Sequence, residues 1–231
     1  GKTLGENLEE LKKNGFYEKC QKWLEEFNKR YNIHLTREDI IRPYDKAIGT
    51  DGSIAILKGN LAPEGAVIKH TACPKEMFKA VLRARPFDSE EECLDAVLKH
   101  KVQKGDAVFI RYEGPKGGPG MKELHRITEI IKGIPNTAVI TDGRFSGASG
   151  GLSIGYLCPE AAEGGPIALV KDGDRITVDL YKDYLHLEVS DNELEARRRE
   201  WKAVRRPREK GLLGRYARLV NTARSGAARN R

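Results

Sequence analysis

From about residue 40 onward the sequence is divided into short, β-branched runs, and this division limits the fold more than any other feature of the chain. Each run is bounded by Gly, Pro, Asp or Asn, a pattern typical of β-strands. The run at 175–180, RITVDL, alternates apolar and polar residues as a half-buried strand does. The polar residues 171–174 separate two runs and predict a hairpin. The predicted strands are SIAILKGN, AVIKHTA, DAVFIRYEG, NTAVITDG, PIALVKDG, RITVDLY and YLHLEVS.

Helical segments alternate with these predicted strands. Residues 88–100 place Ser89 before a turn rich in acidic side chains, which favours a helix start. Residues 121–133 form a second helical segment, and residues 190–201 begin with the Ser190 and Glu193 pattern of a capping box. Several strands mixed with a few helices predict a barrel-like or layered α/β domain.

The first 39 residues have a different pattern, rich in Lys and Glu. Apolar side chains recur at roughly helical spacing over residues 3–31, and Asn14-Gly15 predicts a break into two helices. We therefore expect two parts: a helical linker or arm over residues 1–39, and an α/β domain over residues 40–231 that ends in a basic helical tail.

The composition is that of a soluble globular protein, with 39% hydrophobic and 32% charged residues. No apolar run approaches the ~18 residues of a membrane span, and the first 15 residues lack the apolar core of a signal peptide. The four cysteines, Cys20, Cys73, Cys93 and Cys158, lie far apart and form no CxxC or CxH pair. This spacing favours reduced thiols in a cytoplasmic protein and argues against a zinc or iron–sulfur site built from this chain alone.

The net charge of +7 is concentrated at the C-terminus. Residues 197–231 contain 13 Lys or Arg and two Asp or Glu. Such a tail can bind nucleic acid or an acidic protein surface. Against nucleic acid, it offers only Trp201 and Tyr216 for base stacking and contains no recognisable motif. The pattern favours a docked or solvated terminal helix.

Two glycine-rich loops follow predicted strands, one at 112–123 and one at 142–151. Backbone N–H groups in such strand-exit loops can converge on an anion. Neither loop has the spacing of a P-loop or a dinucleotide fingerprint. From the glycines alone, each loop is as readily a structural turn as a binding site.

The side chains in these loops narrow the chemistry. Glu113 and Glu123 bracket the first loop, and the Glu123 carboxylate suits a hard cation such as Mg²⁺, although a solvated glutamate has the same sequence pattern. Ser146 stands beside Gly147 in the second loop. A serine hydroxyl needs a neighbouring base or a metal to become reactive, and Ser146 is not the serine of an SxxK or GxSxG pattern. The five histidines show no metal-ligand spacing.

Long blocks of the sequence resemble the C-terminal domain of the dihydroxy-acid and sugar-acid dehydratase family, and the dihydroxy-acid branch most closely. The blocks are IRPYDKAIGTDGSIAILKGNLAPEGAVIK, FDSEEECLDAVL, GDAVFIRYEGPKGGPGMKEL, ITDGRFSGASGGLSIGYLCPEAAEGGPIALVKDGD and LGRYARLVNTARSGAA. The resemblance covers roughly residues 40–228 and extends to the opening GKTLGENL. It implies an α/β fold, a swivelling β/β/α domain with a barrel-like mixed sheet core and peripheral helices.

The resemblance also implies a reaction, the removal of water from a 2,3-dihydroxy-3-methyl carboxylate to give a 2-keto acid in branched-chain amino acid biosynthesis. An iron–sulfur cluster and Mg²⁺ assist a serine base in this reaction. The DGRFSG motif implies that Ser146 is the base, and GPGMKE implies that Glu123 is a Mg²⁺ ligand. Arg144, Gly147 and Ser149 are then expected to contact the substrate.

In such enzymes an N-terminal domain, on the same or a separate chain, holds the cluster cysteines and most Mg²⁺ ligands, so we expect this chain to be inactive alone. The complete enzyme is expected to be a cytoplasmic homo-oligomer that binds no membrane. Two residues depart from the usual motifs: Ser149 stands where threonine is usual, and Tyr156 where histidine is usual. With these departures, a sugar acid remains an alternative substrate. The sequence also leaves open a non-catalytic relative that binds an anion or a protein, and a nucleic-acid module based on the basic tail.

Overall fold

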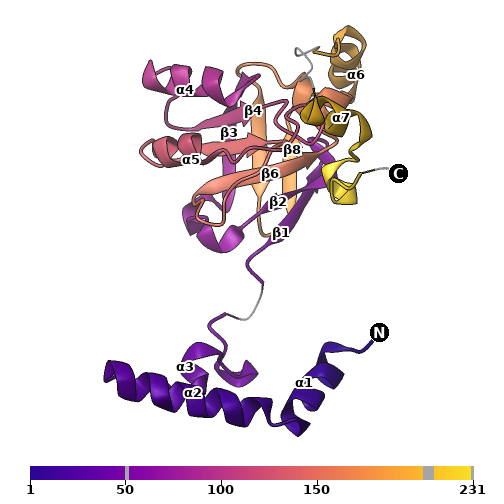
Figure 1. Cartoon of the computed structure of the whole chain (residues 1–231). Helices are drawn as coiled ribbons and strands as arrows, with labels where there is room; N and C mark the ends of the chain where they lie inside the picture. Colours follow the sequence, from indigo (N-terminus) through magenta and orange to yellow (C-terminus); the bar gives the residue numbers. More distant parts are fainter. Residues whose placement is uncertain (50–51, 205–210, 230–231) are drawn as a thin grey trace. The chain divides into compact units, whose positions relative to one another are not determined.

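The computed structural model describes residues 1–49, 52–204 and 211–229 (Figure 1). Contacts divide the chain into two units, Gly1–Gly52 and Ser53–Arg231, and each is described by itself. In the second unit eight strands close into a barrel in the order β1-β2-β6-β5-β4-β3-β7-β8. This confirms the α/β class with a barrel-like mixed sheet. The strands are β1 (Ala55–Gly59), β2 (Ala62–Ile68), β3 (Lys79–Phe87), β4 (Asp106–Ile110), β5 (Ala138–Thr141), β6 (Leu152–Cys158), β7 (Arg175–Asp179) and β8 (Tyr184–Leu187).

Four neighbouring strands, β3, β4, β5 and β6, run parallel, and this part of the barrel positions the glycine-rich loops. Phe87, Ile110 and Thr141 lie opposite one another at the carboxyl ends of β3, β4 and β5. The loops that follow these three strands therefore leave from the same end of the barrel.

The core explains why some strands alternate in hydrophobicity and others do not. Every residue of β4 is buried, because Phe109 points into the barrel while Val108 packs outward against the helices. Strands covered on both faces read as continuous apolar runs. In β7 only Ile176 and Val178 are buried, as the alternation of RITVD predicts.

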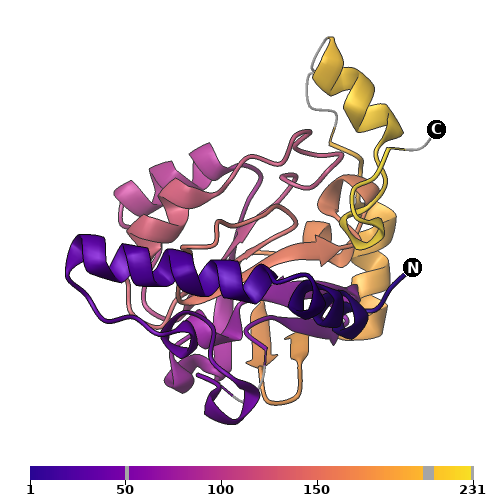
Figure 2. The ribbon, with the colours of Figure 1, turned by 60° about the horizontal axis from the view of Figure 1, so that its bottom comes forward.

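Two helices cover the outside of the parallel strands. The helices α4 (Glu90–Leu98) and α5 (His125–Ile131) lie side by side there (Figures 1 and 2). Cys93, Ile127 and Ile131 form with Val108 and Val139 a second apolar cluster. The side chain of Ser89 accepts the N–H of Glu92, as the predicted helix start requires.

The C-terminal part contributes α6 (Asp191–Glu200) and α7 (Leu212–Leu219). Ser190 caps α6 by accepting the N–H of Glu193. Arg197 anchors α6 to the barrel through two bonds to Asp174, at 2.6 and 3.0 Å, and one to the carbonyl of Leu169. Short 3-10 helices connect the elements: η2 (His70–Ala72), η3 (Lys75–Met77), η4 (Ala161–Glu163), η5 (Pro166–Leu169) and η6 (Ala223–Ser225).

The hairpin predicted at 171–174 is wrong. The preceding segment, PIAL, forms η5 rather than a strand, and it buries Ile167 and Leu169 in the core. Residues 171–174 lead from η5 into β7, and the observed hairpin joins β7 to β8. Just before η5 the chain passes close to another segment, because a Cβ at Gly165 would lie 1.9 Å from the carbonyl oxygen of Pro159.

The first unit is helical, with α1 (Leu4–Lys13), α2 (Phe16–Tyr31), α3 (Arg37–Ile40) and η1 (Tyr44–Lys46). The break between α1 and α2 falls at Asn14 and Gly15, which confirms that prediction. Gly15 has a φ of 75°, a left-handed conformation that glycine adopts at little cost. The expected boundary between residues 39 and 40 stays a prediction.

Within the described residues, no helix combines the length and the apolar character needed to cross a membrane.

Candidate functional site

The two glycine-rich loops emerge from neighbouring parallel strands at the same end of the barrel. The first follows β4 and leads to α5, and the second follows β5 and leads to β6. The crevice outside the carboxyl ends of parallel strands is where open α/β sheets usually bind ligands. The topology thus brings together the two segments that carry the predicted site residues.

Arg144 joins the two loops. Its Nε donates to the carbonyl oxygen of Met121 at 2.5 Å, and its Nη1 lies 3.2 Å from Oε1 of Glu123. The backbone of Arg144 also pairs with the backbone of Glu123, and its carbonyl oxygen accepts the N–H of Leu124 at 3.3 Å. Two of the predicted site residues, Glu123 and Arg144, are therefore in direct contact.

Ser146 lies half-buried in the second loop. Its Oγ accepts the N–H of Ala148 at 3.2 Å, and its carbonyl oxygen accepts the N–H of Ser149 at 3.3 Å. Among the described residues no side-chain base contacts this hydroxyl. Lys69, the residue after β2, donates its Nζ to the carbonyl oxygen of Gly147. Sequence reasoning missed Lys69, because β2 reaches this loop only through the barrel's strand order.

Gly147 and Ser149 have contrasting surroundings. A Cβ at Gly147 would meet no atom within 4 Å, so the fold of this chain does not by itself require glycine there. Ser149 is 5% exposed, and its Oγ has no hydrogen-bond partner among the described residues. The substrate-contact roles expected for Arg144, Gly147 and Ser149 stay predictions.

A buried carboxylate, Asp142, ties the loops to the barrel. It is fully buried and accepts the N–H groups of Tyr112 at 3.1 Å, Glu113 at 3.0 Å and Ala161 at 2.8 Å. Burial raises the pKa of Asp142, and these hydrogen bonds oppose that rise. The converging N–H groups at this point hold an internal carboxyl group.

A second internal carboxylate fills the first glycine-rich loop. Glu160 accepts the N–H groups of Lys116 and Gly117, and burial raises the pKa of Glu160 to about 7. The anion-binding geometry expected from GPKGGPG is thus present, but the protein's own side chain occupies it. Sequence reasoning missed Glu160 because it lies more than 40 positions along the chain from Lys116 and Gly117.

Glu113 and Glu123 bracket the first loop, as expected, but they face different surroundings. Glu113 is 3% exposed and accepts the N–H of Glu90 at the start of α4. The Glu123 side chain is 45% exposed, and Arg144 leaves part of its carboxylate open. Of the two, Glu123 is the carboxylate that a ligand can reach.

The Glu123 carboxylate suits Mg²⁺, which prefers oxygen ligands. Among the described residues no group of three or more His, Cys, Asp or Glu side chains is placed to hold a metal ion. Glu123 therefore offers one carboxylate to such an ion, and a complete metal site would need ligands from outside the described residues.

The cysteines do not fit an iron–sulfur cluster within this chain. Cys73, Cys93 and Cys158 are buried at separate places, whereas Cys20 is partly exposed in α2. Burial raises the pKa of Cys73 to about 11 and also raises the pKa of Cys93 and Cys158. Cluster ligation needs thiolates, so we derive no step through a cluster from these residues.

We expect one fast-reacting thiol in the native chain. Ellman's reagent should label Cys20 within minutes at pH 8, whereas the other three should react only after denaturation, because their burial disfavours the thiolate. A Cys20→Ser variant should lose the fast phase. Rapid release of two or more equivalents from the native wild type would contradict the buried positions.

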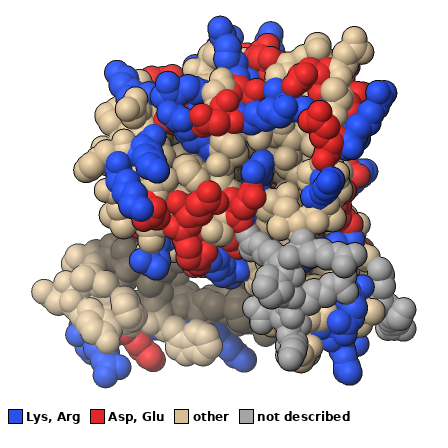
Figure 3. All heavy atoms as spheres, turned by 90° about the horizontal axis from the view of Figure 1, so that it is seen from above, with Lys and Arg blue, Asp and Glu red and all other residues tan. Residues whose placement is uncertain are grey.

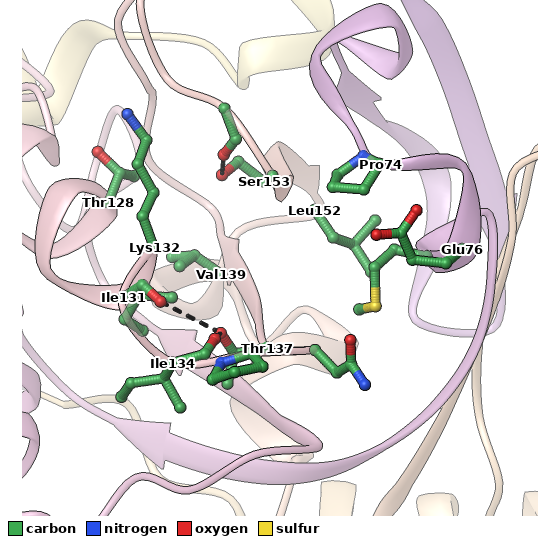
Figure 4. Close-up of a pocket in the computed structure, with 15 residues that line it drawn as sticks. Pro74, Glu76, Thr128, Ile131, Lys132, Ile134, Thr137, Val139, Leu152 and Ser153 are labelled. Atoms are coloured by element: carbon green, nitrogen blue, oxygen red, sulfur yellow. Dashed lines mark hydrogen bonds between the residues drawn. The ribbon is translucent and has the colours of Figure 1, made fainter.

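A cavity of about 350 Å³ adjoins the second loop. Figure 4 shows Thr128 of α5 and Lys132, the residue after α5, facing Pro74 and Glu76 across it. The loop reaches the cavity at residues 150–151, whereas Ser146 and Glu123 do not line it. The cavity therefore borders the candidate site without containing its predicted groups.

On the face drawn in Figure 3, the charges of the described residues give no support to a nucleic-acid module. On the face in Figure 3, acidic and basic side chains intermingle. Residues 205–210 and 230–231 of the basic tail lie outside the described residues. In α7, Arg215 and Arg218 accompany exposed Leu212, a mixed surface rather than a basic stripe.

The closed mixed barrel presents a serine, a lysine, an arginine and one open carboxylate at a single end. A sequence model of the family described as dihydroxy-acid/6-phosphogluconate dehydratase C-terminal matches residues 39–227. The chain therefore belongs to this family.

Its relatives are much longer proteins. It is 49% identical to a dihydroxy-acid dehydratase of Acetivibrio thermocellus over 85% of this chain and 36% of the relative. With the dihydroxy-acid dehydratase of Pyrococcus furiosus the identity is 51% over 84% of this chain and 35% of the relative. With that of Oleidesulfovibrio alaskensis it is 44% over 100% of this chain and 39% of the relative. This last alignment includes the helical first unit, and the chain spans between a third and two fifths of these relatives.

Proposed function

We propose that this chain is the C-terminal part of a dihydroxy-acid dehydratase, which removes water from a 2,3-dihydroxy-3-methyl carboxylate to give a 2-keto acid. The observation that carries the proposal is the meeting of Glu123 and Arg144 across two glycine-rich loops, with Ser146 two residues further on. The names of the relatives support the same reaction.

In this proposal the chain's own residues bind the substrate and move a proton. Ser146 Oγ, acting as the alkoxide, accepts the proton from C2 of the substrate while the C3–O bond breaks. The departing hydroxide and the C2 proton together make up the water that is lost, and the enol left behind tautomerises to the 2-keto acid. Arg144 and Lys69 have cationic side chains. The Nζ of Lys69 donates to the carbonyl oxygen of Gly147, the residue after Ser146. Both cationic side chains can orient a carboxylate by charge. Ser149 supplies a buried hydroxyl without a partner among the described residues.

The proposal includes Mg²⁺, with Glu123 as the ligand from this chain. When bound, Mg²⁺ supplies positive charge that polarises substrate oxygen atoms and favours loss of a proton. The other metal ligands and the cysteines of an iron–sulfur cluster belong to an N-terminal segment, on the same or a separate chain. We propose that the complete protein works in the cytoplasm as a homo-oligomer.

A sugar-acid dehydratase is the second candidate. The family description includes 6-phosphogluconate dehydratase. Lys69 and Arg144 at the second loop suit an anionic substrate group of either kind. The two candidates differ in the substrate that the complete enzyme accepts.

The test is reconstitution. The chain, combined with a matching N-terminal segment, iron, sulfide and Mg²⁺, should convert a 2,3-dihydroxy-3-methyl carboxylate to a 2-keto acid, measured as its hydrazone. The chain alone should give no product, because it offers one metal-ligand carboxylate at the site. Turnover of 6-phosphogluconate instead would favour the second candidate, and turnover by the chain alone would refute the division of the site between two parts.

A further inference from the structure

The carboxylate of Glu160 occupies the place that a bound anion would take in the first glycine-rich loop, and the proposed reaction does not use it. Its Oε1 and Oε2 lie 3.0 and 3.1 Å from the backbone nitrogen of Lys116, and Oε2 lies 2.9 Å from that of Gly117. Glu160 is 2% exposed. The loop is therefore folded around an internal ligand.

The glycines of the loop make this arrangement possible. A Cβ at Gly114 would lie 2.6 Å from Oε2 of Glu160. A Cβ at Gly117 or Gly118 would lie 2.8 or 2.9 Å from the backbone of the preceding strand exit. These approaches are too close for any side chain, so the loop's glycine content is explained by its fit to Glu160 and to the strand exit.

A continuous series of hydrogen bonds leads from this loop to the candidate site. Gly118 donates its N–H to the carbonyl of Gly114 at 2.8 Å, and Met121 donates to Gly118 at 2.8 Å. The carbonyl of Met121 then accepts Nε of Arg144. Arg144 contacts Glu123, so the position of Glu123 depends on the conformation of the loop before it.

We propose that Glu160 is a positioning residue that holds the first glycine-rich loop and thereby places Glu123 beside Arg144. The part of this inference that concerns metal binding rests on the proposed function, whereas the loop contact does not. A positioning role predicts that the acceptor oxygen matters more than its charge.

The surroundings of Glu160 indicate which replacements separate these two properties. Burial is the main cause of its raised pKa; the N–H groups of Gly117 and Lys116 lower the pKa, and the carboxylates of Asp142 and Glu163 raise it. Glutamine keeps an oxygen at the same reach without the charge. Aspartate keeps the charge but withdraws the carboxylate by one methylene.

Amide hydrogen exchange of the full chain, followed by NMR, tests the proposal. The amides of Lys116, Gly117 and Leu124 should exchange at least about ten times faster in Glu160→Asp and Glu160→Ala than in the wild type, because each loses a hydrogen bond or the order that supports it. In Glu160→Gln they should stay within about threefold of the wild type. Glu160→Asp keeps the test valid if Glu160→Ala does not fold.

Glu163→Gln is the matched control. Glu163 contacts the same loop through Nζ of Lys116 rather than through its backbone, so its loss should leave the three amides unchanged. In the reconstituted enzyme, Glu160→Asp should raise the Mg²⁺ concentration for half-maximal activity, and Glu160→Gln should not. The proposal would be overturned if Glu160→Asp left the exchange of Lys116 and Gly117 unchanged. It would also be overturned if these two amides exchanged faster while the exchange of Leu124 and the Mg²⁺ requirement stayed unaltered. An inactive wild-type reconstitution would count against the proposed function, and the exchange rates would still decide whether Glu160 holds the loop.

Discussion

Replacement of Ser146 by alanine is expected to lower the turnover number of the reconstituted dehydratase by about 10³-fold. The hydroxyl is the group proposed to accept the C2 proton, and no other side-chain base among the described residues contacts it. Substrate affinity should change little, because Arg144 and Lys69 remain. Steady-state kinetics, with substrate affinity measured separately by calorimetry, distinguish the two quantities.

Ser153→Ala is the matched control for this experiment. Ser153 lies on β6, just beyond the same loop, and its Oγ donates to the carbonyl of Gly150 at 3.0 Å. Its loss removes one local hydrogen bond and should leave turnover within a few-fold of the wild type. Turnover in Ser146→Ala equal to that in Ser153→Ala would remove Ser146 from the reaction.

Replacement of Asp142 by alanine is expected to lower the free energy of unfolding of the chain by about 3–5 kcal/mol. The carboxylate accepts three N–H groups, and each buried donor left without a partner costs about 1–3 kcal/mol. Relief of burying the charge offsets part of this loss. Urea unfolding monitored by the fluorescence of Trp201, which packs against the barrel core, measures the change.

Asp95→Ala provides the comparison. Asp95 forms an exposed pair with Lys99 one turn along α4, and exposed pairs of this spacing contribute about 0.3–0.5 kcal/mol. If Asp142→Ala and Asp95→Ala had similar unfolding free energies, the three N–H groups at Asp142 would not depend on its carboxylate in the native state. Asp142 would then not be the residue that ties the loops to the barrel.

Local patterns predicted several elements correctly, each for a physical reason contained within a few residues. Ser89 and Ser190 mark helix starts because a hydroxyl three positions before an N–H group can cap it. Gly15 marks a helix break because glycine adopts a positive φ easily. The alternation in β7 follows from one face being buried. The predicted hairpin at 171–174 failed because turn residues do not report whether the preceding apolar run becomes a strand or a buried 3-10 turn.

The candidate site was predictable only in part. The glycines at 114–120 and 143–151 indicated loops able to bind an anion, and the resemblance pointed to Ser146 and Glu123. Arg144 and Glu123 were expected in one site, but their contact depends on β4 and β5 being parallel neighbours. Lys69 was missed because it arrives from β2, which pairs with the strand after the loop.

Taken alone, the sequence determined the strand and helix content, the family resemblance and the residue types in the two loops, because these depend on local spacing and on motifs. Tertiary structure decided which group the first loop holds. The N–H groups of Lys116 and Gly117 would suit a bound ligand. Instead they donate to the carboxylate of Glu160, which lies in the segment after β6. Asp142 likewise gathers three N–H groups from two separate places in the chain. These hydrogen bonds join residues that are far apart in the sequence. Burial makes them important, because a buried carboxyl group costs free energy unless it finds hydrogen-bond donors.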